Sequence, residues 1–90
     1  MRRVVWTDEA ASDLDGIQAY IGQFNPLAAQ RLGARLIATA ATLAQHAERG
    51  RLTRNGLREL TIIHPYLIRY RVERDVVVVL RCWHGARQID

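Results

Sequence analysis

The sequence contains no lysine and only one cysteine, and both shortages limit what the protein can be. All thirteen basic residues are arginine, whose planar, forked group suits carboxylates and phosphates. Because Cys82 has no second cysteine to pair with, a disulfide framework and a cysteine-based zinc site are excluded. The three histidines are scattered along the chain. We therefore expect no metal site and no other cofactor.

Long hydrophobic runs are also absent. The longest purely apolar stretch, Val76 to Leu80, is far shorter than the ~20 residues of a membrane-spanning helix. The start, Met1-Arg2-Arg3, leads into no hydrophobic signal core. Ninety residues suffice for one modest core. We expect a cytoplasmic protein without membrane contact, folded as a single domain over residues 1–90.

The charges are unevenly distributed along the chain. The formal net charge is +4, and nine of the thirteen arginines lie from Arg49 to Arg87. The acidic residues concentrate between Asp8 and Asp15. A GC-rich gene would also favour arginine codons, but the clustering predicts a basic C-terminal half. Such a surface suits an acidic protein partner or nucleic acid.

The first half of the chain predicts a strand followed by two helices. Residues 3–6 read as a short strand, and Thr7 is a good N-cap for a helix with an apolar stripe. Asn25-Pro26 marks a restart, because proline fits the first helical position. The second helix is predicted to run to about Ala47. The stripe of the first helix consists of Leu14, Ile17, Ile21 and Phe24.

The second half changes to a period of two, which is typical of strands. After a predicted loop at 48–55, strands are expected at 58–63, 66–72 and 76–83, and the last two form an antiparallel hairpin. The expected fold class is α+β. An N-terminal strand and a helical hairpin precede an antiparallel sheet of three C-terminal strands, with the helices on one face.

Alternation along the hairpin predicts which side chains face outward. Tyr66, Ile68, Tyr70 and Val72 would pack under the helices, together with Val76, Val78, Leu80 and Cys82. The opposite face would mix arginines with apolar side chains, which favours a partner-covered surface. A strand buried on both sides by its own chain is the alternative. The predicted partner-binding residues are Leu67, Arg69, Arg71, Val77, Val79, Arg81 and Trp83. Trp83 is interpreted either as an anchor for a partner helix or as internal packing.

Three segments of the second half resemble RelE/ParE toxins. They are Gly56-Leu-Arg-Glu-Leu-Thr-Ile, Tyr66-Leu-Ile-Arg-Tyr-Arg-Val and Val79-Leu-Arg-Cys-Trp-His-Gly-Ala-Arg87. The front half agrees, with Glu9-Ala-Ala-Ser-Asp-Leu14 and a hairpin restarted at Asn25-Pro26. The resemblance covers nearly the whole chain and is greatest to the ParE branch.

The resemblance implies the toxin of a type II toxin–antitoxin module, a class associated with growth inhibition and plasmid stabilisation. In this family the C-terminal segment of a cognate antitoxin wraps the toxin, giving a hetero-oligomer. The antitoxin's N-terminal part binds DNA, so no sequence-specific DNA binding is expected of this chain. ParE-like members inhibit DNA gyrase, whereas RelE-like members cut messenger RNA within the ribosome.

The sequence favours the gyrase inhibitor, which has no catalytic residues, over the ribonuclease. Leu67 stands where the nucleases are similar in carrying an arginine, and no tyrosine follows Arg87. If the chain is a nuclease, His84 is the candidate acid–base group, and Arg81 and Arg87 would hold a phosphate. His84 could instead satisfy a carbonyl or carboxylate at a strand end. An inactive homologue that only binds an antitoxin remains a third reading.

Overall fold

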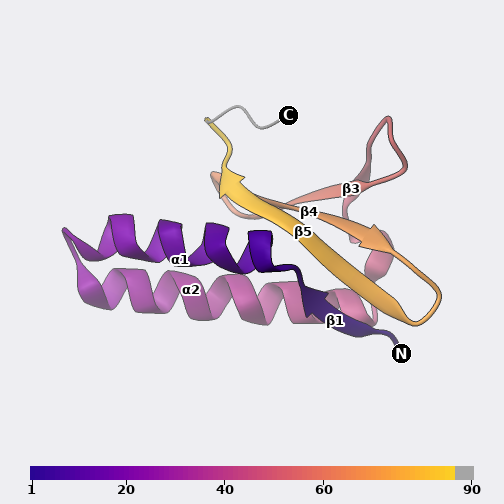
Figure 1. The fold of residues 1–90 in the computed structure, drawn as a ribbon, viewed down its shortest axis with the longest axis horizontal. Coiled ribbons are helices and arrows are strands. Elements are labelled where there is room, and N and C mark those ends of the chain that lie inside the picture. Colours follow the sequence, from indigo (N-terminus) through magenta and orange to yellow (C-terminus); the bar gives the residue numbers. More distant parts are fainter. Residues whose placement is uncertain (87–90) are drawn as a thin grey trace.

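The chain folds into two helices that lie against one face of a five-stranded sheet (Figure 1). The structure is a computed structural model that describes residues 1–86. Arg87, which belongs to the alternative nuclease prediction, lies outside the described residues. The elements are β1 (Arg3–Trp6), α1 (Asp8–Gly22), α2 (Pro26–Ala41), two 3₁₀ turns (Thr42–Ala44 and Ala47–Arg49), β2 (Arg51–Leu52), β3 (Arg58–Ile63), β4 (Tyr66–Val72) and β5 (Val76–His84).

Both helices begin where the sequence predicts. The Thr7 hydroxyl accepts a hydrogen bond from the Ala10 amide at 3.1 Å and caps α1. The Asn25 side chain accepts from the Ala28 amide at 3.0 Å, and Pro26 occupies the first turn of α2. Among residues 1–86, neither helix combines the length and the apolar character needed to cross a membrane.

The second helix ends earlier than predicted. It stops at Ala41 rather than near Ala47, and the chain tightens into 3₁₀ turns. At this point the Thr42 hydroxyl donates to the Thr39 carbonyl at 2.6 Å, a local bond that competes with the regular helical pattern. The predicted loop at 48–55 likewise contains a two-residue strand, β2.

The sheet contains more strands than predicted, although the α+β class with the helices on one face is confirmed. Its order is β1-β5-β4-β3-β2. The N-terminal strand β1 pairs in parallel with β5 through Val76 to Val79, and all other neighbours are antiparallel. Because β1 is short, residues 80–84 of β5 have no strand partner on that side. This uncovered edge of β5 faces the start of α1.

The faces predicted for β5 are wrong for Val77 to Val79, whereas Cys82 lies in the core as predicted. Tyr70 pairs with Val79 but Arg69 pairs with Arg81, so Leu80 is an additional residue that forms a bulge. Val77 and Val79 are 0% exposed and belong to the core, so they have no surface to offer a partner. Val78 lies beside Arg71 on the open face instead. The prediction for β4 is correct, since Ile68 and Tyr70 are buried on the helix side.

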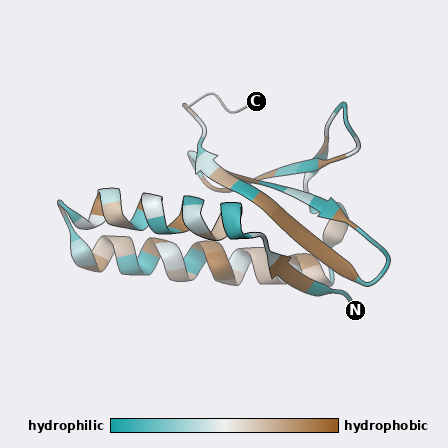
Figure 2. Ribbon diagram, in the orientation of Figure 1, coloured by the Kyte–Doolittle hydropathy of each residue, from teal (hydrophilic) through white to brown (hydrophobic). Residues whose placement is uncertain are grey.

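The core lies between the helices and the middle of the sheet. Leu36 and Leu43 pack with Ile68, Val77 and Val79 in one buried cluster. Figure 2 shows that β5 and β1 carry the most hydrophobic stretches, which meet at their parallel pairing. Phe24, which was predicted to continue the apolar stripe of α1, lies beyond the helix end and is exposed.

Tyr70 ties the sheet to the turns that follow α2. Its hydroxyl donates to the Ala47 carbonyl at 2.6 Å and accepts from the Gly50 amide at 2.8 Å. The Arg58 guanidinium donates to the Gly50 carbonyl at 2.8 Å. Burial raises the pKa of Tyr70 above its usual value. The phenol therefore remains a neutral hydrogen-bonding group inside the fold.

We expect Tyr70→Phe to lower the free energy of unfolding by about 1–3 kcal/mol, because it leaves the buried Gly50 amide without its acceptor. Urea denaturation followed by circular dichroism measures this loss. Tyr20→Phe is the control, since Tyr20 is exposed and such changes stay within about 0.5 kcal/mol. Equal stability of the two variants would show that the Tyr70 hydroxyl contributes nothing.

Candidate partner-binding groove

The open face of the sheet carries paired rather than free charges. A row of cross-strand partners runs through Arg51, Glu59, Arg69 and Arg81. Two guanidinium nitrogens of Arg69, Nε and Nη2, bind one Glu59 oxygen at 3.0 and 2.9 Å, and Arg51 binds the other oxygen at 3.3 Å. A carboxylate thus offsets part of the positive charge predicted for this face.

The other sheet arginines of the predicted surface also contact carboxylates of the same chain. Arg71 pairs with Glu73 at 2.6 Å near the β4–β5 turn. Arg81 pairs with Asp13 of α1 at 2.7 Å. The open face is therefore less basic than its composition suggests, although Leu67, Arg69 and Arg71 lie on it as predicted.

Trp83 is largely covered by its own chain. It pairs with Leu67 across β4 and β5, and the Arg69 guanidinium lies 5.0 Å from the centre of its ring. Its exposed fraction is 8%. Of the two interpretations from the sequence, the burial favours internal packing, with Arg69 stacked on the indole as a cation–π contact.

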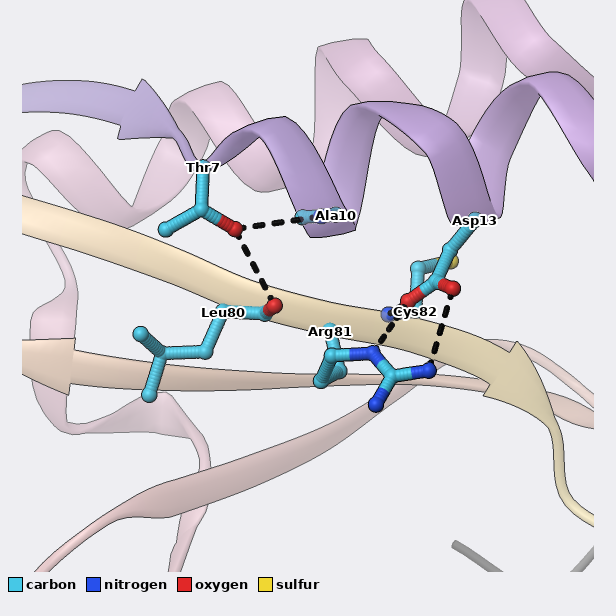
Figure 3. A network of polar contacts seen from close by, with 6 residues as sticks. All are labelled: Thr7, Ala10, Asp13, Leu80, Arg81 and Cys82. Atoms are coloured by element: carbon cyan, nitrogen blue, oxygen red, sulfur yellow. Dashed lines mark hydrogen bonds and ion pairs between the residues drawn. The ribbon is translucent and has the colours of Figure 1, made fainter.

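Asp13 holds the uncovered edge of β5 to α1. Its two carboxylate oxygens accept from Nε and Nη2 of Arg81 at 2.7 and 3.2 Å, and one of them also accepts from the Cys82 amide at 2.9 Å (Figure 3). Nearby, the Thr7 hydroxyl donates to the Leu80 carbonyl at 3.1 Å. These side chains satisfy backbone groups that would otherwise invite another strand.

The same contacts set the ionisation of the neighbouring groups. The hydrogen bonds from Arg81 to Asp13, followed by their charge attraction, raise the pKa of Arg81, which therefore stays charged. Burial, and to a smaller extent the Asp13 charge, raises the pKa of Cys82 to about 11. The Cys82 thiol is consequently protonated near neutral pH, so it is neither a nucleophile nor a metal ligand there.

Beside this edge lies a groove between α1 and the end of β5, with a volume of about 640 Å³. We call it the α1–β5 groove. The groove has open space at Gly16, where a Cβ atom would meet no atom within 4 Å. Its lining residues are Ser12, Asp13, Gly16, Ile17 and Tyr20 from α1, and Tyr66, Arg81, Cys82, Trp83 and His84 from the sheet.

His84 and Arg81, two candidates of the nuclease alternative, both line this groove. The His84 ring lies edge-on to Tyr66 at 5.3 Å, and its Nδ1 accepts from the Ala86 amide at 3.1 Å. His84 thus satisfies a backbone group at the strand end, although the bond comes from an amide rather than from the predicted carbonyl or carboxylate. Arg81 is engaged by Asp13, whose negative charge beside it opposes a bound phosphate.

The α1–β5 groove as a whole was not predicted from the sequence. Of the predicted partner-binding residues, Arg81 and Trp83 line it, whereas Leu67, Arg69 and Arg71 lie on the open face of the sheet. A signal was present in α1. Ser12, Gly16 and Tyr20 recur every four residues, and a glycine inside a helix costs about 1 kcal/mol relative to alanine, which is a reason to look for a space that it keeps open.

Comparisons of the sequence with known proteins give matches over nearly the whole chain. A family model described as "ParE toxin of type II toxin-antitoxin system, parDE" matches residues 4–89. Toxin RelE2 of Caulobacter vibrioides is 52% identical, over 97% of this chain and 99% of that protein. Toxin RelE3 of the same organism is 33% identical, over 94% and 96% of the two chains.

Solved structures also match nearly the whole chain. A chain from the chromosomal ParDE system of P. aeruginosa superimposes with a TM-score of 0.85 at 28% identity, covering 93% of this chain and 96% of that one. The Helicobacter pylori protein HP0894 shares the fold with a TM-score of 0.60 at 17% identity, covering 97% of this chain and 98% of that one.

Proposed function

This chain belongs to the ParE toxin family of type II toxin–antitoxin systems, and we propose that it acts in the cytoplasm by binding and inhibiting DNA gyrase. Membership of the family implies a cognate antitoxin that neutralises it. On this proposal the chain has no catalytic residues. Growth stops because the toxin occupies a large enzyme, and it resumes when the antitoxin occupies the toxin.

The ion pair between Asp13 and Arg81 carries the preference for binding over RNA cleavage. Cleavage through a 2′-hydroxyl needs cations that hold the phosphate and groups that transfer protons. Arg81 is an arginine that the nuclease alternative assigns to the phosphate. Its guanidinium instead donates two hydrogen bonds to the Asp13 carboxylate. A phosphate entering the groove would have to displace Asp13, which also holds the Cys82 amide.

The α1–β5 groove is the surface that we assign to the antitoxin. Its lining includes Ile17, aromatic side chains and the ion pair of Asp13 with Arg81, which suits an amphipathic helix. The space at Gly16 lets such a helix approach α1 closely. Occupation of the groove would bury Ile17, Tyr20 and Tyr66 against the partner.

The alternative function is a ribosome-dependent mRNA endoribonuclease. The observation in its favour is that Arg81 and His84 line one groove, so a proton-transfer group and a cation lie near each other. An inactive homologue that only binds an antitoxin is the remaining possibility, which predicts no growth arrest.

A supercoiling assay with purified gyrase separates these functions. We expect the purified toxin to inhibit supercoiling, and addition of the antitoxin to restore it. In parallel, reporter mRNA on purified ribosomes should remain intact. Intact gyrase activity together with ribosome-dependent cuts in the mRNA would replace this proposal with the nuclease. Full growth during expression without antitoxin would favour the inactive homologue.

A further inference from the structure

The helical hairpin extends beyond the sheet, and its far end carries large exposed apolar side chains (Figure 1). Phe24, in the turn between α1 and α2, is 74% exposed, and Leu27, in the first turn of α2, is 53% exposed. Arg31 and Arg35 follow Leu27 at intervals of four along α2, which places the three on one stripe of the helix. We call Phe24, Leu27, Arg31 and Arg35 the hairpin tip.

Packing within the fold does not explain why these large apolar side chains are exposed. Tyr20 meets the Phe24 ring edge-on at 5.6 Å, yet Tyr20 is 66% exposed, so the contact covers neither ring. Two aromatic rings and a leucine close together on one projecting end are unlike the single apolar residues scattered over an ordinary surface. Aromatic residues and arginine are also enriched in protein–protein interfaces relative to the rest of the surface.

The charge around the tip has one sign. No acidic residue occurs from Gly16 to Ala47, and the only arginines in this stretch are Arg31 and Arg35. None of the ion pairs among residues 1–86 involves either of them. Leu27, Arg31 and Arg35 border a shallow hollow of about 260 Å³ along α2. The complementary surface is therefore apolar at its centre and acidic at its rim.

We propose that the hairpin tip is the surface with which the toxin contacts its protein target, through an acidic-rimmed apolar patch on that target. This inference rests on the proposed function, since it assumes that the toxin acts by binding a protein. The tip is distinct from the α1–β5 groove, but Tyr20 belongs to the groove lining and contacts Phe24 of the tip. An antitoxin helix in the groove thus ends beside the tip and excludes the target by its volume.

Two double variants test the tip, and neither changes a groove residue. Phe24→Ala with Leu27→Ala removes the apolar centre, and Arg31→Glu with Arg35→Glu reverses the charge. We expect each to raise at least tenfold the toxin concentration that half-inhibits gyrase, and to abolish growth arrest at expression levels where the wild type arrests growth. The dissociation constant for the antitoxin should stay within twofold of the wild type.

The matched control is Leu52→Ala with Arg54→Glu, which removes an exposed leucine and reverses an exposed arginine outside the hairpin. This control variant should inhibit gyrase and bind the antitoxin as strongly as the wild type does. Thermal unfolding of all variants shows that each is folded, and a tip variant that fails to fold is replaced by Phe24→Ser alone.

Several results would overturn the assignment of the tip. Undiminished growth arrest by both tip variants would remove it from the target interface. A loss of antitoxin affinity would assign the tip to the antitoxin, and a loss of self-association in sedimentation would assign it to a second copy. If the wild type arrests growth without affecting gyrase, the proposed target is wrong, while the growth assay still tests the tip.

Discussion

A tryptophan in place of Gly16 is expected to weaken antitoxin binding by at least about 100-fold, which corresponds to roughly 2.7 kcal/mol. Gly16 lies in the wall of the α1–β5 groove, and the space in front of it is open, because a Cβ atom there would meet no atom within 4 Å. An indole at this position would fill the space that we assign to the partner helix. Isothermal titration calorimetry with the antitoxin measures the change.

Gly16→Ala is the matched control for this variant. Alanine and tryptophan both remove the flexibility of a glycine inside α1, but the alanine side chain is only the Cβ atom, for which the groove has room. Alanine should therefore keep the affinity and raise stability by roughly 0.5–1 kcal/mol. Equal antitoxin affinity of the alanine and tryptophan variants would show that the antitoxin does not enter the groove.

The second large effect is expected at Trp83. Truncation of a buried tryptophan to alanine costs about 3–5 kcal/mol, and Trp83 is 8% exposed beneath the Arg69 guanidinium. We expect Trp83→Ala to lower the free energy of unfolding by this amount, measured by urea denaturation. Because small domains are only about 5–15 kcal/mol stable, this loss is a large fraction of the total stability.

Trp83→Phe is the control, since it keeps an aromatic ring under Arg69 and should lose less stability. Antitoxin binding that is lost in the alanine variant but kept in the phenylalanine variant would reflect unfolding rather than a lost contact. If Trp83→Ala proves as stable as the wild type but no longer binds the antitoxin, the residue is a partner anchor and its burial has been misinterpreted.

The order of the elements and the helix caps could be predicted from local signals. Thr7, Asn25 and Pro26 act within a few residues of their positions in the chain, and these predictions are confirmed. The inward side chains of β4 were also predicted correctly, because Ile68 and Tyr70 alternate with arginines. In these segments the sequence itself distinguishes the two faces.

The faces of β5 could not be predicted in the same way. Val76 to Leu80 are all apolar, so the pattern gives no alternation to read, and the bulge at Leu80 shifts the register between the two halves of the strand. A continuous apolar run is typical of a strand covered on both faces, whereas in this fold Val78 lies beside Arg71 on the open face. The sequence therefore contained no signal for the position of the bulge.

Contacts that join distant parts of the chain explain the remaining differences. Asp13 and Arg81 are 68 residues apart, and only the pairing of β1 with β5 brings α1 to the uncovered edge. That arrangement creates the α1–β5 groove and moves the candidate surface away from the open face. By contrast, Glu59 and Arg69 lie opposite each other on the neighbouring strands β3 and β4, only ten residues apart in the chain.

The central claim is that the toxin acts as a stoichiometric ligand of gyrase rather than as a catalyst, and a calorimetric titration of toxin into purified gyrase tests it most directly. We predict heat of binding that saturates at a fixed molar ratio, and no heat from toxin that has first been saturated with antitoxin. Absence of binding heat from free, folded toxin that nevertheless arrests growth would contradict the claim.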